Sequence, residues 1–437
     1  MEGLMKIRKG TARRIVTALA AAASVALVVS GCSVTGATSN QGAGGGDSGT
    51  INALFMKQAG YSESDVNAMI SSFEKKYPKI KVNPTFVAYE ALHDKIVTSA
   101  PAGTYDVALM DVIWPTEFAS KGLITDLSDK FPSSWKDEML GGALTSAEWK
   151  GKYYGVPWGP STKLFYYNKA MLAKVGATGA DVTTWDGVLA VAKKLKDAGV
   201  VKYPLTWSWS QAEALICDYA VMLGAFGGDF TTSDGKLDLN SKEGVAALTW
   251  MRKTITDGLT DPASLTYLED DTDKSMAAGH SAMQLNWESA FRDFNDSSIS
   301  SIVGQAVVTP PPTGPTGLNP GVNGSMALAI PTGSKHKDAA WTFIKYITSQ
   351  PVQDKYAKSA MPNWKSSFSN PDVVKTNPEV FKAAGQAYDK MINRPEVANY
   401  NTVSQILQVQ LQNALLGKVT PQQALDAAQS QASAAKD

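Results

Sequence analysis

Short apolar segments alternate with amphipathic helical segments along most of the chain, and this alternation constrains the fold more than any other feature. The first series predicts strands and helices at 51–55, 64–77, 80–82, 89–99 and 105–110, followed by a short helix at 115–121. Strands separated by helices in this way are typical of βαβ units, in which the helices cover a parallel sheet. A second series begins with a strand at 164–168 and continues with helices at 185–198, 212–223 and 242–257, and later helices are predicted at 338–349, 401–416 and 421–434. Because 437 residues exceed the usual size of one domain, the two series predict two α/β lobes.

The N-terminal residues 1–31 have the pattern of an export signal. Five basic residues precede the apolar run 15–29, which is too short to span a membrane comfortably. The run ends at Val29-Ser30-Gly31-Cys32, which resembles a bacterial lipobox and predicts a lipoprotein whose mature chain begins at Cys32, with a lipid on that residue. The alternative is an ordinary secretory signal that is cleaved elsewhere. The segment 32–49 is rich in Gly, Ser and Thr and predicts a flexible tether.

Charge and composition exclude several classes of function. The part after residue 31 has 36 basic and 40 acidic residues, a net charge near −4, so we expect no nucleic-acid partner. A metal site would need clustered ligands, whereas His93, His280 and His336 are far apart in the sequence. Cys217 has no second Cys in the mature body and is predicted to be a small core residue. The sequence also lacks a Gly-rich phosphate-binding loop followed by Lys-Ser or Lys-Thr, so we expect neither a cofactor nor ATP hydrolysis by this chain.

Several separated strings resemble one family, the extracellular sugar-binding proteins of bacterial ATP-driven importers. In the order of that family they are Tyr105-Asp106-Val107 with Asp111, 118–127, 151–157 with 164–169, Thr184-Trp185-Asp186, 277–283 before Trp287, 335–341 and 420–425. The resemblance implies a periplasmic-binding-protein-like II fold, in which two α/β lobes are joined by three crossings near 159–163, 323–326 and 361–364. It assigns 50–160 and 326–361 to lobe 1, and 161–325 and 362–437 to lobe 2, with the ligand cleft between them.

A sugar presents hydroxyl groups at its rim and a weakly apolar C–H face, so its site needs planar polar groups and aromatic rings. Trp287 matches the position where the family commonly has a stacking Trp, and it is the first candidate. The other ligand-binding candidates are Gln58, Tyr61, Tyr89, Asp111, Trp114, Trp158, Trp207, Trp209, Glu288, Asn323, Trp364 and Arg394. Core packing or hinge support is the alternative for any of the Trp residues, and a helix cap or a surface ion pair is the alternative for Asp111 and Glu288.

The resemblance implies a binding protein rather than an enzyme. Such a protein is a monomer, lipid-anchored at the extracellular face of the cell membrane, that closes its lobes on a di- or oligosaccharide and delivers it to the permease subunits of an ABC importer. Two alternatives are open. A secreted glycoside hydrolase would need a pair of carboxylates, but the acidic residues at 269–273 are typical of a solvated loop. A protein of the same fold for peptides or polyamines would have acidic groups in the cleft without stacked aromatic rings.

Overall fold

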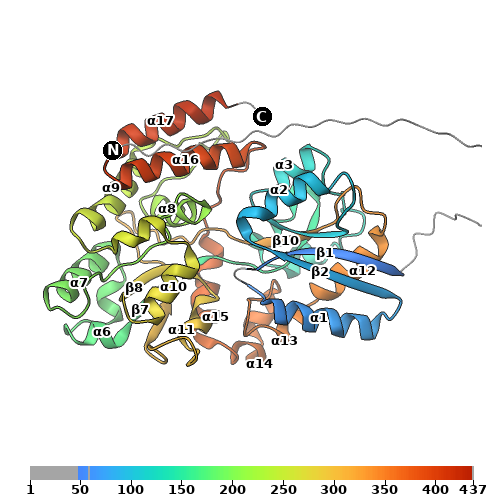
Figure 1. Cartoon of the computed structure of the whole chain (residues 1–437), viewed down its shortest axis with the longest axis horizontal. Coiled ribbons are helices and arrows are strands. Elements are labelled where there is room, and N and C mark those ends of the chain that lie inside the picture. The colour runs from blue at the N-terminus through green and yellow to red at the C-terminus, as the bar shows by residue number, and fades with distance from the viewer. Residues whose placement is uncertain (1–47, 58–59, 436–437) are drawn as a thin grey trace, which may run out of the picture. The chain divides into compact units, whose positions relative to one another are not determined.

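The computed structural model describes residues 48–57 and 60–435, and within them two sheets have separate cores (Figure 1). The mixed α/β class predicted from the sequence is confirmed. The expected signal peptide at 1–31, Cys32, most of the expected tether and Gln58 lie outside the described residues.

Lobe 1 contains a five-stranded sheet with the strand order β2-β1-β3-β10-β6. These strands are β1 (Gly49–Met56), β2 (Ile80–Val87), β3 (Val107–Asp111), β6 (Gly155–Pro157) and β10 (Met326–Ala329). β1 pairs in parallel with β2 and with β3, as the βαβ pattern predicts, whereas β10 is antiparallel to β3 and β6. Because β10 follows the whole second sheet in the sequence, lobe 1 is assembled from two separate segments of the chain.

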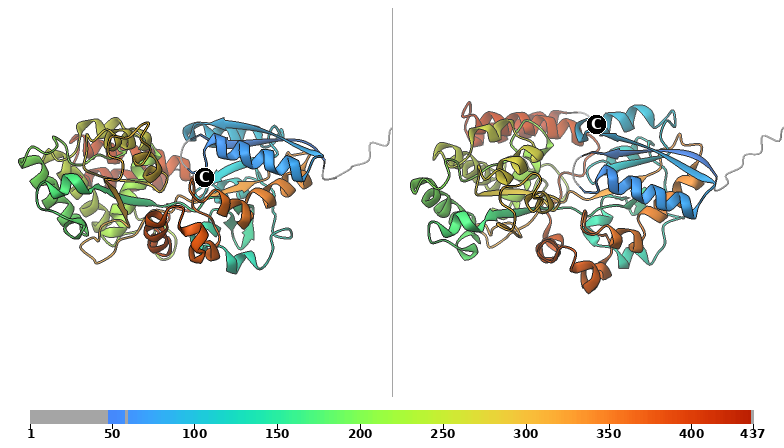
Figure 2. Two further views of the ribbon diagram at one scale, coloured as in Figure 1. Left: turned by 90° about the horizontal axis from the view of Figure 1, so that it is seen from below. Right: turned by 60° about the horizontal axis from the view of Figure 1, so that its bottom comes forward.

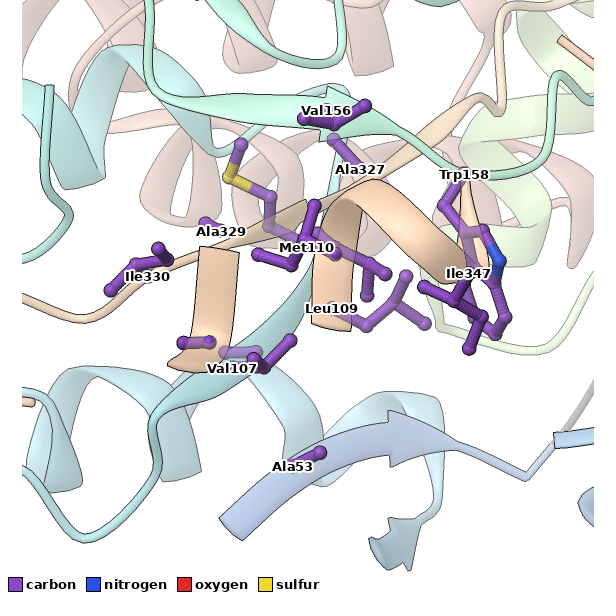
Figure 3. Packing of buried hydrophobic residues seen from close by; sticks show 14 of the residues in the cluster. Ala53, Val107, Leu109, Met110, Val156, Trp158, Ala327, Ala329, Ile330 and Ile347 are labelled. Carbon is purple, nitrogen blue, oxygen red and sulfur yellow. The ribbon is translucent and has the colours of Figure 1, made fainter. Parts of the chain in front are cut away.

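Helices cover both faces of this sheet. They are α1 (Glu63–Lys76), α2 (Tyr89–Ser99), α3 (Pro115–Ser120), α4 (Trp135–Glu138), α5 (Gly141–Leu144), α12 (Lys337–Ile347) and α13 (Gln350–Lys355), and a small hairpin joins β4 (Glu148–Trp149) to β5 (Lys152–Tyr153). In α1, Ser62 and Asp65 form a capping box, and Val66, Met69 and Phe73 recur at helical spacing on the buried side. α2 and α3 lie on one face of the sheet, and α1 and α12 lie together on the other (Figures 1 and 2). The apolar side chains of β3, β10 and α12 meet in the core between them (Figure 3).

Lobe 2 contains a three-stranded sheet with the order β8-β7-β9, formed by β7 (Lys163–Asn168), β8 (Met283–Trp287) and β9 (Ala306–Thr309). In this sheet β7 is antiparallel to both β8 and β9, unlike the parallel pairs of the first βαβ units. The alternation of strands and helices along the sequence does not determine strand direction, so this difference was not predicted. Phe165 and Tyr167 point into one core and Leu164 and Tyr166 into another, as the two-residue period of a strand requires.

The helices of lobe 2 enclose both of these cores. They are α6 (Lys169–Ala173), α7 (Trp185–Asp197), α8 (Glu213–Ala225), α9 (Lys242–Thr256), α10 (Glu269–Ala277), α11 (Ala290–Phe294), α14 (Pro371–Val374), α15 (Pro378–Ala387), α16 (Tyr400–Leu415) and α17 (Pro421–Ala434). Within the described residues, four short 3₁₀ turns complete the elements, η1 (Gly179–Val182), η2 (Pro262–Thr266), η3 (Lys365–Ser369) and η4 (Tyr388–Lys390).

The acidic stretch 269–273 corrects the sequence prediction, because it forms the start of α10 and not a solvated loop. Acidic side chains in a first helical turn are stabilised by the unpaired N–H groups and by the positive end of the helix dipole, so a run of acidic residues is compatible with a helix start. Asp273 is partly buried, and its carboxyl group accepts hydrogen bonds from Gln284 Nε2 at 2.8 Å and from Asn286 Nδ2 at 2.7 Å.

The chain passes between the sheets from β6 to β7, from β9 to β10, and again after α13. Asn323 ties these passages to the segment before α16. It forms an isolated bridge with Thr162, its N–H donates to the Ile392 carbonyl at 2.9 Å, and its Nδ2 donates to Asn393 Oδ1 at 3.0 Å. Asn323 therefore holds backbone segments together, and the lobe limits assigned from the sequence stay a prediction.

Candidate functional site

Arg394 is the centre of a buried polar cluster with members from both lobes. Its two terminal nitrogens donate to Asp111 Oδ1 and to Glu213 Oε1, each at 2.8 Å. Tyr89 Oη donates to the other oxygen of Asp111 at 2.6 Å, and Tyr400 Oη donates to Glu213. Asp111 ends β3 and Tyr89 begins α2, whereas Glu213 begins α8 and Tyr400 begins α16. These five residues, called the Arg394 cluster below, bring helix and strand ends of the two lobes together.

The electrostatics of the Arg394 cluster favour hydrogen bonding to neutral hydroxyl groups. Burial by itself lowers the pKa of Arg394, but the nearby charges, that of Asp111 first, outweigh it and hold the pKa above the usual value. Burial and then the charge of Asp111 raise the pKa of Tyr89, so its hydroxyl remains protonated. All four carboxylate oxygens of Asp111 and Glu213 already accept hydrogen bonds from the protein, including Glu213 Oε2, which accepts from Ser404 Oγ at 2.6 Å, so only their remaining lone pairs are left for a ligand that donates hydrogen bonds.

A second polar group surrounds Lys163, whose side chain is completely buried at the start of β7. Its Nζ contacts Asp218 Oδ1 at 2.6 Å, Ser208 Oγ at 2.9 Å and Glu269 Oε1 at 3.4 Å. Burial, the largest single effect, lowers the pKa of Lys163, but the charges of Asp218 and Glu269 and the hydrogen bond to Asp218 together outweigh it and raise the pKa above its usual value. Lys163 is therefore a cation held in a dry environment beside two acidic side chains.

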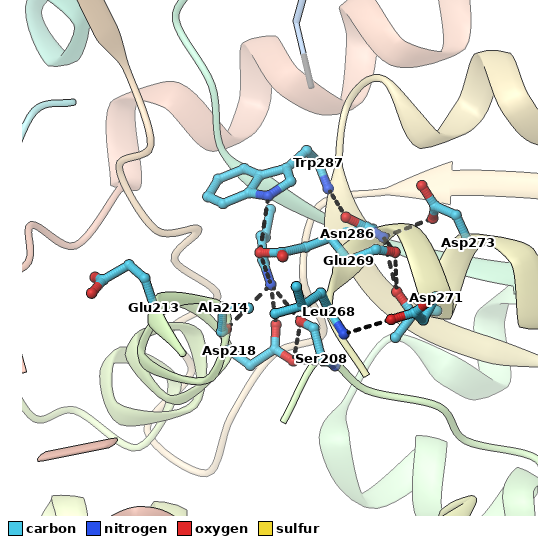
Figure 4. Close-up of polar contacts among 12 residues, drawn as sticks. Ser208, Glu213, Ala214, Asp218, Leu268, Glu269, Asp271, Asp273, Asn286 and Trp287 are labelled. Carbon is cyan, nitrogen blue, oxygen red and sulfur yellow. Dashed lines mark hydrogen bonds and ion pairs between the residues drawn. The ribbon is translucent and has the colours of Figure 1, made fainter. Parts of the chain in front are cut away.

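Trp287, at the end of β8, lies directly on this group (Figure 4). Its Nε1 donates to Glu269 Oε1 at 3.3 Å, and Lys163 Nζ lies 5.3 Å from its ring centroid, within the range of a cation–π contact. A Cβ atom at Gly324 would lie 2.4 Å from the indole ring, so only glycine leaves room for the ring in this position. Trp287 is partly exposed, and these contacts hold its indole in one orientation.

Glu288 has a different environment from the expected one. Its carboxylate accepts hydrogen bonds from Ser161 Oγ at 2.8 Å, from the Thr162 N–H at 2.8 Å and from Tyr388 Oη at 2.9 Å. Burial, the dominant cause, raises the pKa of Glu288 to about 7. Because both carboxylate oxygens are engaged by the protein, Glu288 links β8 to the first crossing in this conformation.

Most of the other predicted aromatic residues are buried in the lobe cores. Trp207 and Trp209 stack on each other at 5.3 Å inside lobe 2. Trp114 lies beneath Tyr89, with ring centroids 5.8 Å apart, and is 2% exposed. In lobe 1, Trp158 stacks on Tyr61 at 4.8 Å, and Trp364 packs edge-on against Trp135 and donates to the Thr348 carbonyl. These Trp residues therefore take part in core packing, which was the alternative to ligand binding in the sequence prediction. Among the described aromatic candidates, only Trp287 and Tyr89 are partly exposed.

Several residues of these two groups were missed by the sequence prediction, among them Lys163, Glu213 and Glu269. Lys163 is the only charged residue in the otherwise apolar strand β7, which was a usable signal. Glu213 begins α8, a helix whose other residues are all buried, and it too had a signal. Glu269 was assigned to a loop, and no local pattern indicates that it contacts Trp287.

The described residues contain no group of three or more His, Cys, Asp or Glu side chains that could hold a metal ion. Among these residues there is likewise no helix of the length and apolar character needed to cross a membrane.

Comparisons with known proteins give a consistent result. A family model described as bacterial extracellular solute-binding protein matches residues 44–354. The arabinooligosaccharide-binding protein of Bacillus subtilis is 26% identical over 331 residues, which cover 73% of this chain and 72% of that protein. The solved structure of maltose-bound MalE3 from T. maritima is 30% identical, with a TM-score of 0.79, and covers 87% of this chain and 98% of that one. An ABC transporter solute-binding protein from Thermotoga lettingae, solved with α-D-tagatose, is 27% identical with a TM-score of 0.79 and covers 88% and 98%.

Proposed function

The chain belongs to the family of bacterial extracellular solute-binding proteins, and on this basis we propose that it is the lipid-anchored, sugar-binding component of an ABC importer. Its cargo is a di- or oligosaccharide. Relatives at similar distances bind arabinooligosaccharide, maltose or tagatose according to their names, and all three are sugars.

One observation carries the sugar proposal, the fixed and partly exposed indole of Trp287. An aromatic face of this kind stacks on the C–H face of a sugar ring, and holding the ring in place before binding reduces the entropy lost on binding. The carboxylate oxygens of Asp111 and Glu213, which accept from protein groups in this conformation, keep further lone pairs for sugar hydroxyls. A peptide- or polyamine-binding protein would use the same acidic groups but would not need the indole face.

Lobe closure is the proposed mechanism. Asp111 and Tyr89 belong to lobe 1, and Trp287 and Glu213 belong to lobe 2, so a ligand that contacts both sets stabilises the closed state by its higher affinity for that state. The closed monomer then delivers its cargo to the permease subunits in the membrane. Each role proposed here is binding, and none requires a catalytic step.

Thermal unfolding of the mature chain, beginning at residue 32, against mono-, di- and oligosaccharides, peptides and polyamines tests the cargo. A sugar at 100 times its Kd stabilises the folded state by about 2.7 kcal/mol, which corresponds to roughly 3 °C for a chain of this length. The shift should vanish in Trp287→Ala and persist in the matched control Trp149→Ala, because Trp149 is also partly exposed but lies in the β4–β5 hairpin. A shift with amines alone would reject the sugar proposal.

The anchor is tested separately by cell fractionation. The full chain should be recovered with the cell membrane, and Cys32→Ser should release it into the medium or periplasm. Equal membrane recovery of both chains would reject lipid attachment at Cys32 and would leave the sugar result unaffected.

A further inference from the structure

Basic side chains surround the point at which the described chain enters lobe 1. The Gly49 N–H donates to the Lys79 carbonyl at 2.9 Å, and Thr50 pairs with Lys81 in the ladder of β1 and β2. A Cβ atom at Gly49 would lie 3.5 Å from His336 Nδ1, which places the start of α12 beside the same point. The surface formed here, called the basic end of lobe 1, consists of Lys75, Lys76, Lys79, Lys81, Lys335, His336 and Lys337.

Most of these charges are not neutralised by neighbours. Within the described residues, Lys81 pairs with Glu74 at 3.1 Å, and Asp338 at the start of α12 pairs with Lys130 at 3.0 Å. The same residues provide no ion pair for the other lysines of the basic end. Lys76 instead lies over the rings of Tyr77 and Tyr346. A local positive excess therefore lies on a mature chain whose net charge is near −4.

The exposure of these side chains makes them available to a partner. Lys75, Lys76, Lys79, Lys81 and Lys335 are all exposed, and Lys337 is partly exposed. The basic end is also close in sequence to the proposed anchor, because residues 33–48 alone separate Cys32 from Gly49. A Gly- and Ser-rich segment of this length has an end-to-end distance of about 20 Å. A lipid on Cys32 would thus keep this surface near the bilayer.

We propose that the basic end of lobe 1 docks on anionic phospholipid headgroups of the membrane that carries the anchor. The proposal rests on the proposed lipid anchor for its proximity and on the exposed lysines for its chemistry. At physiological salt the Debye length is about 8 Å, and the attraction between an exposed lysine and a lipid headgroup is largely screened beyond that distance. The lysines therefore act once the anchor has brought lobe 1 close to the membrane. Lysine clusters next to a membrane anchor bind anionic headgroups by this attraction.

Docking in this way orients the binding site. β1 begins at the basic end, and β3 runs parallel to β1, so Asp111 at the end of β3 lies at the opposite end of the sheet. Tyr89 contacts Asp111 and lies there too. The Arg394 cluster then faces away from the bilayer, where solute arrives.

The test is sedimentation of the mature Cys32→Ser chain with vesicles, since this chain carries no lipid and its result does not depend on anchoring. Vesicles of phosphatidylcholine are compared with vesicles in which one third of the lipid is phosphatidylglycerol, at low and at high salt. We expect at least tenfold stronger partitioning onto the anionic vesicles at low salt, lost at high salt. Equal partitioning onto both vesicles would overturn the proposal.

Charge-reversal variants locate the surface. Changing Lys75, Lys79 and Lys335 together to Glu should reduce partitioning at least tenfold. The matched control changes Lys174, Lys202 and Lys382 to Glu, which alters the net charge equally at exposed positions of lobe 2, and should stay within twofold of the parent. An unchanged sugar-induced thermal shift shows that both variants are folded. Equal losses of vesicle binding in the two variants would show that net charge alone is responsible, and this result would overturn the proposal. Full vesicle binding by the Lys75, Lys79 and Lys335 variant together with loss of transport in cells would overturn it too, because the lysines would then contact the permease.

Discussion

Replacing Glu288 by Gln should make the protein more stable at alkaline pH. The Glu288 carboxyl is buried, and burial raises its pKa from 4.5 to about 7. The folded state therefore binds more protons than the unfolded state between these pH values. The stabilisation that belongs to this group is fully present below pH 4.5 and is lost as the pH rises through 7.

The size of the effect follows from the shift. One pKa unit corresponds to about 1.4 kcal/mol, so the ionised carboxylate costs about 3 kcal/mol at pH 8. An unfolding entropy of about 2.1 cal/mol/K per residue over roughly 390 residues converts this into about 4 °C. A Gln amide oxygen can accept from Thr162 and Tyr388, and its NH₂ can donate to Ser161 Oγ, so each present contact has a substitute.

The assay measures the Tm of Glu288→Gln and of the parent from pH 4.5 to pH 8. Subtracting one Tm from the other at each pH cancels the effect of all other titrating groups, which the two proteins share. We expect no difference near pH 4.5 and a variant that is about 4 °C more stable at pH 8. Glu138→Gln, at an exposed position of α4, is the control and should follow the parent at every pH. A variant less stable at pH 8 would refute the reasoning, because hydrogen bonds to the charged form would then outweigh its burial.

Three further outcomes are expected. Gly324→Ala should displace the indole of Trp287, because the new Cβ would lie 2.4 Å from the ring. Calorimetry should then show sugar binding weakened about tenfold, and adding Gly324→Ala to Trp287→Ala should weaken binding no further than Trp287→Ala alone. Lys163→Met leaves the buried Asp218 without its counter-charge, so a denaturant titration should show an unfolding free energy lower by about 3–5 kcal/mol. Adding Asp218→Leu removes the unpaired carboxylate and should restore most of this loss. Burial raises the pKa of the Cys217 thiol, so a thiol reagent at pH 8 should modify Cys217 only after denaturation; modification of the native chain would contradict its burial.

Local patterns predicted the elements well where the signal lies within one element. The bounds expected for α2 and α17 agree with the structure, since each has a clear apolar period, and α17 also has Pro in its first turn. The direction of β10 has no comparable local signal, because it depends on a partner strand more than 200 residues away.

The candidate site was predictable in its residue types but not in its pairings. Asp111 and Arg394 were both selected from the sequence, yet their ion pair joins positions 283 residues apart, and no local pattern encodes it. The burial of Trp207 and Trp209 was equally hidden, since a Trp near a loop serves a core or a ligand with the same side chain. Such choices are made by long-range packing.

The late position of β10 in the sequence also has a consequence for biogenesis. A family member that functions outside the cell crosses the membrane beginning with its N-terminus, so β1, β2 and β3 emerge well before residues 326–347. Until those residues follow, β3 and β6 have no strand between them, and α12 is missing from the core. Lobe 1 is therefore completed only when most of the polypeptide has been translocated, and its first strands wait outside the membrane without their final neighbours until residues 326–347 arrive.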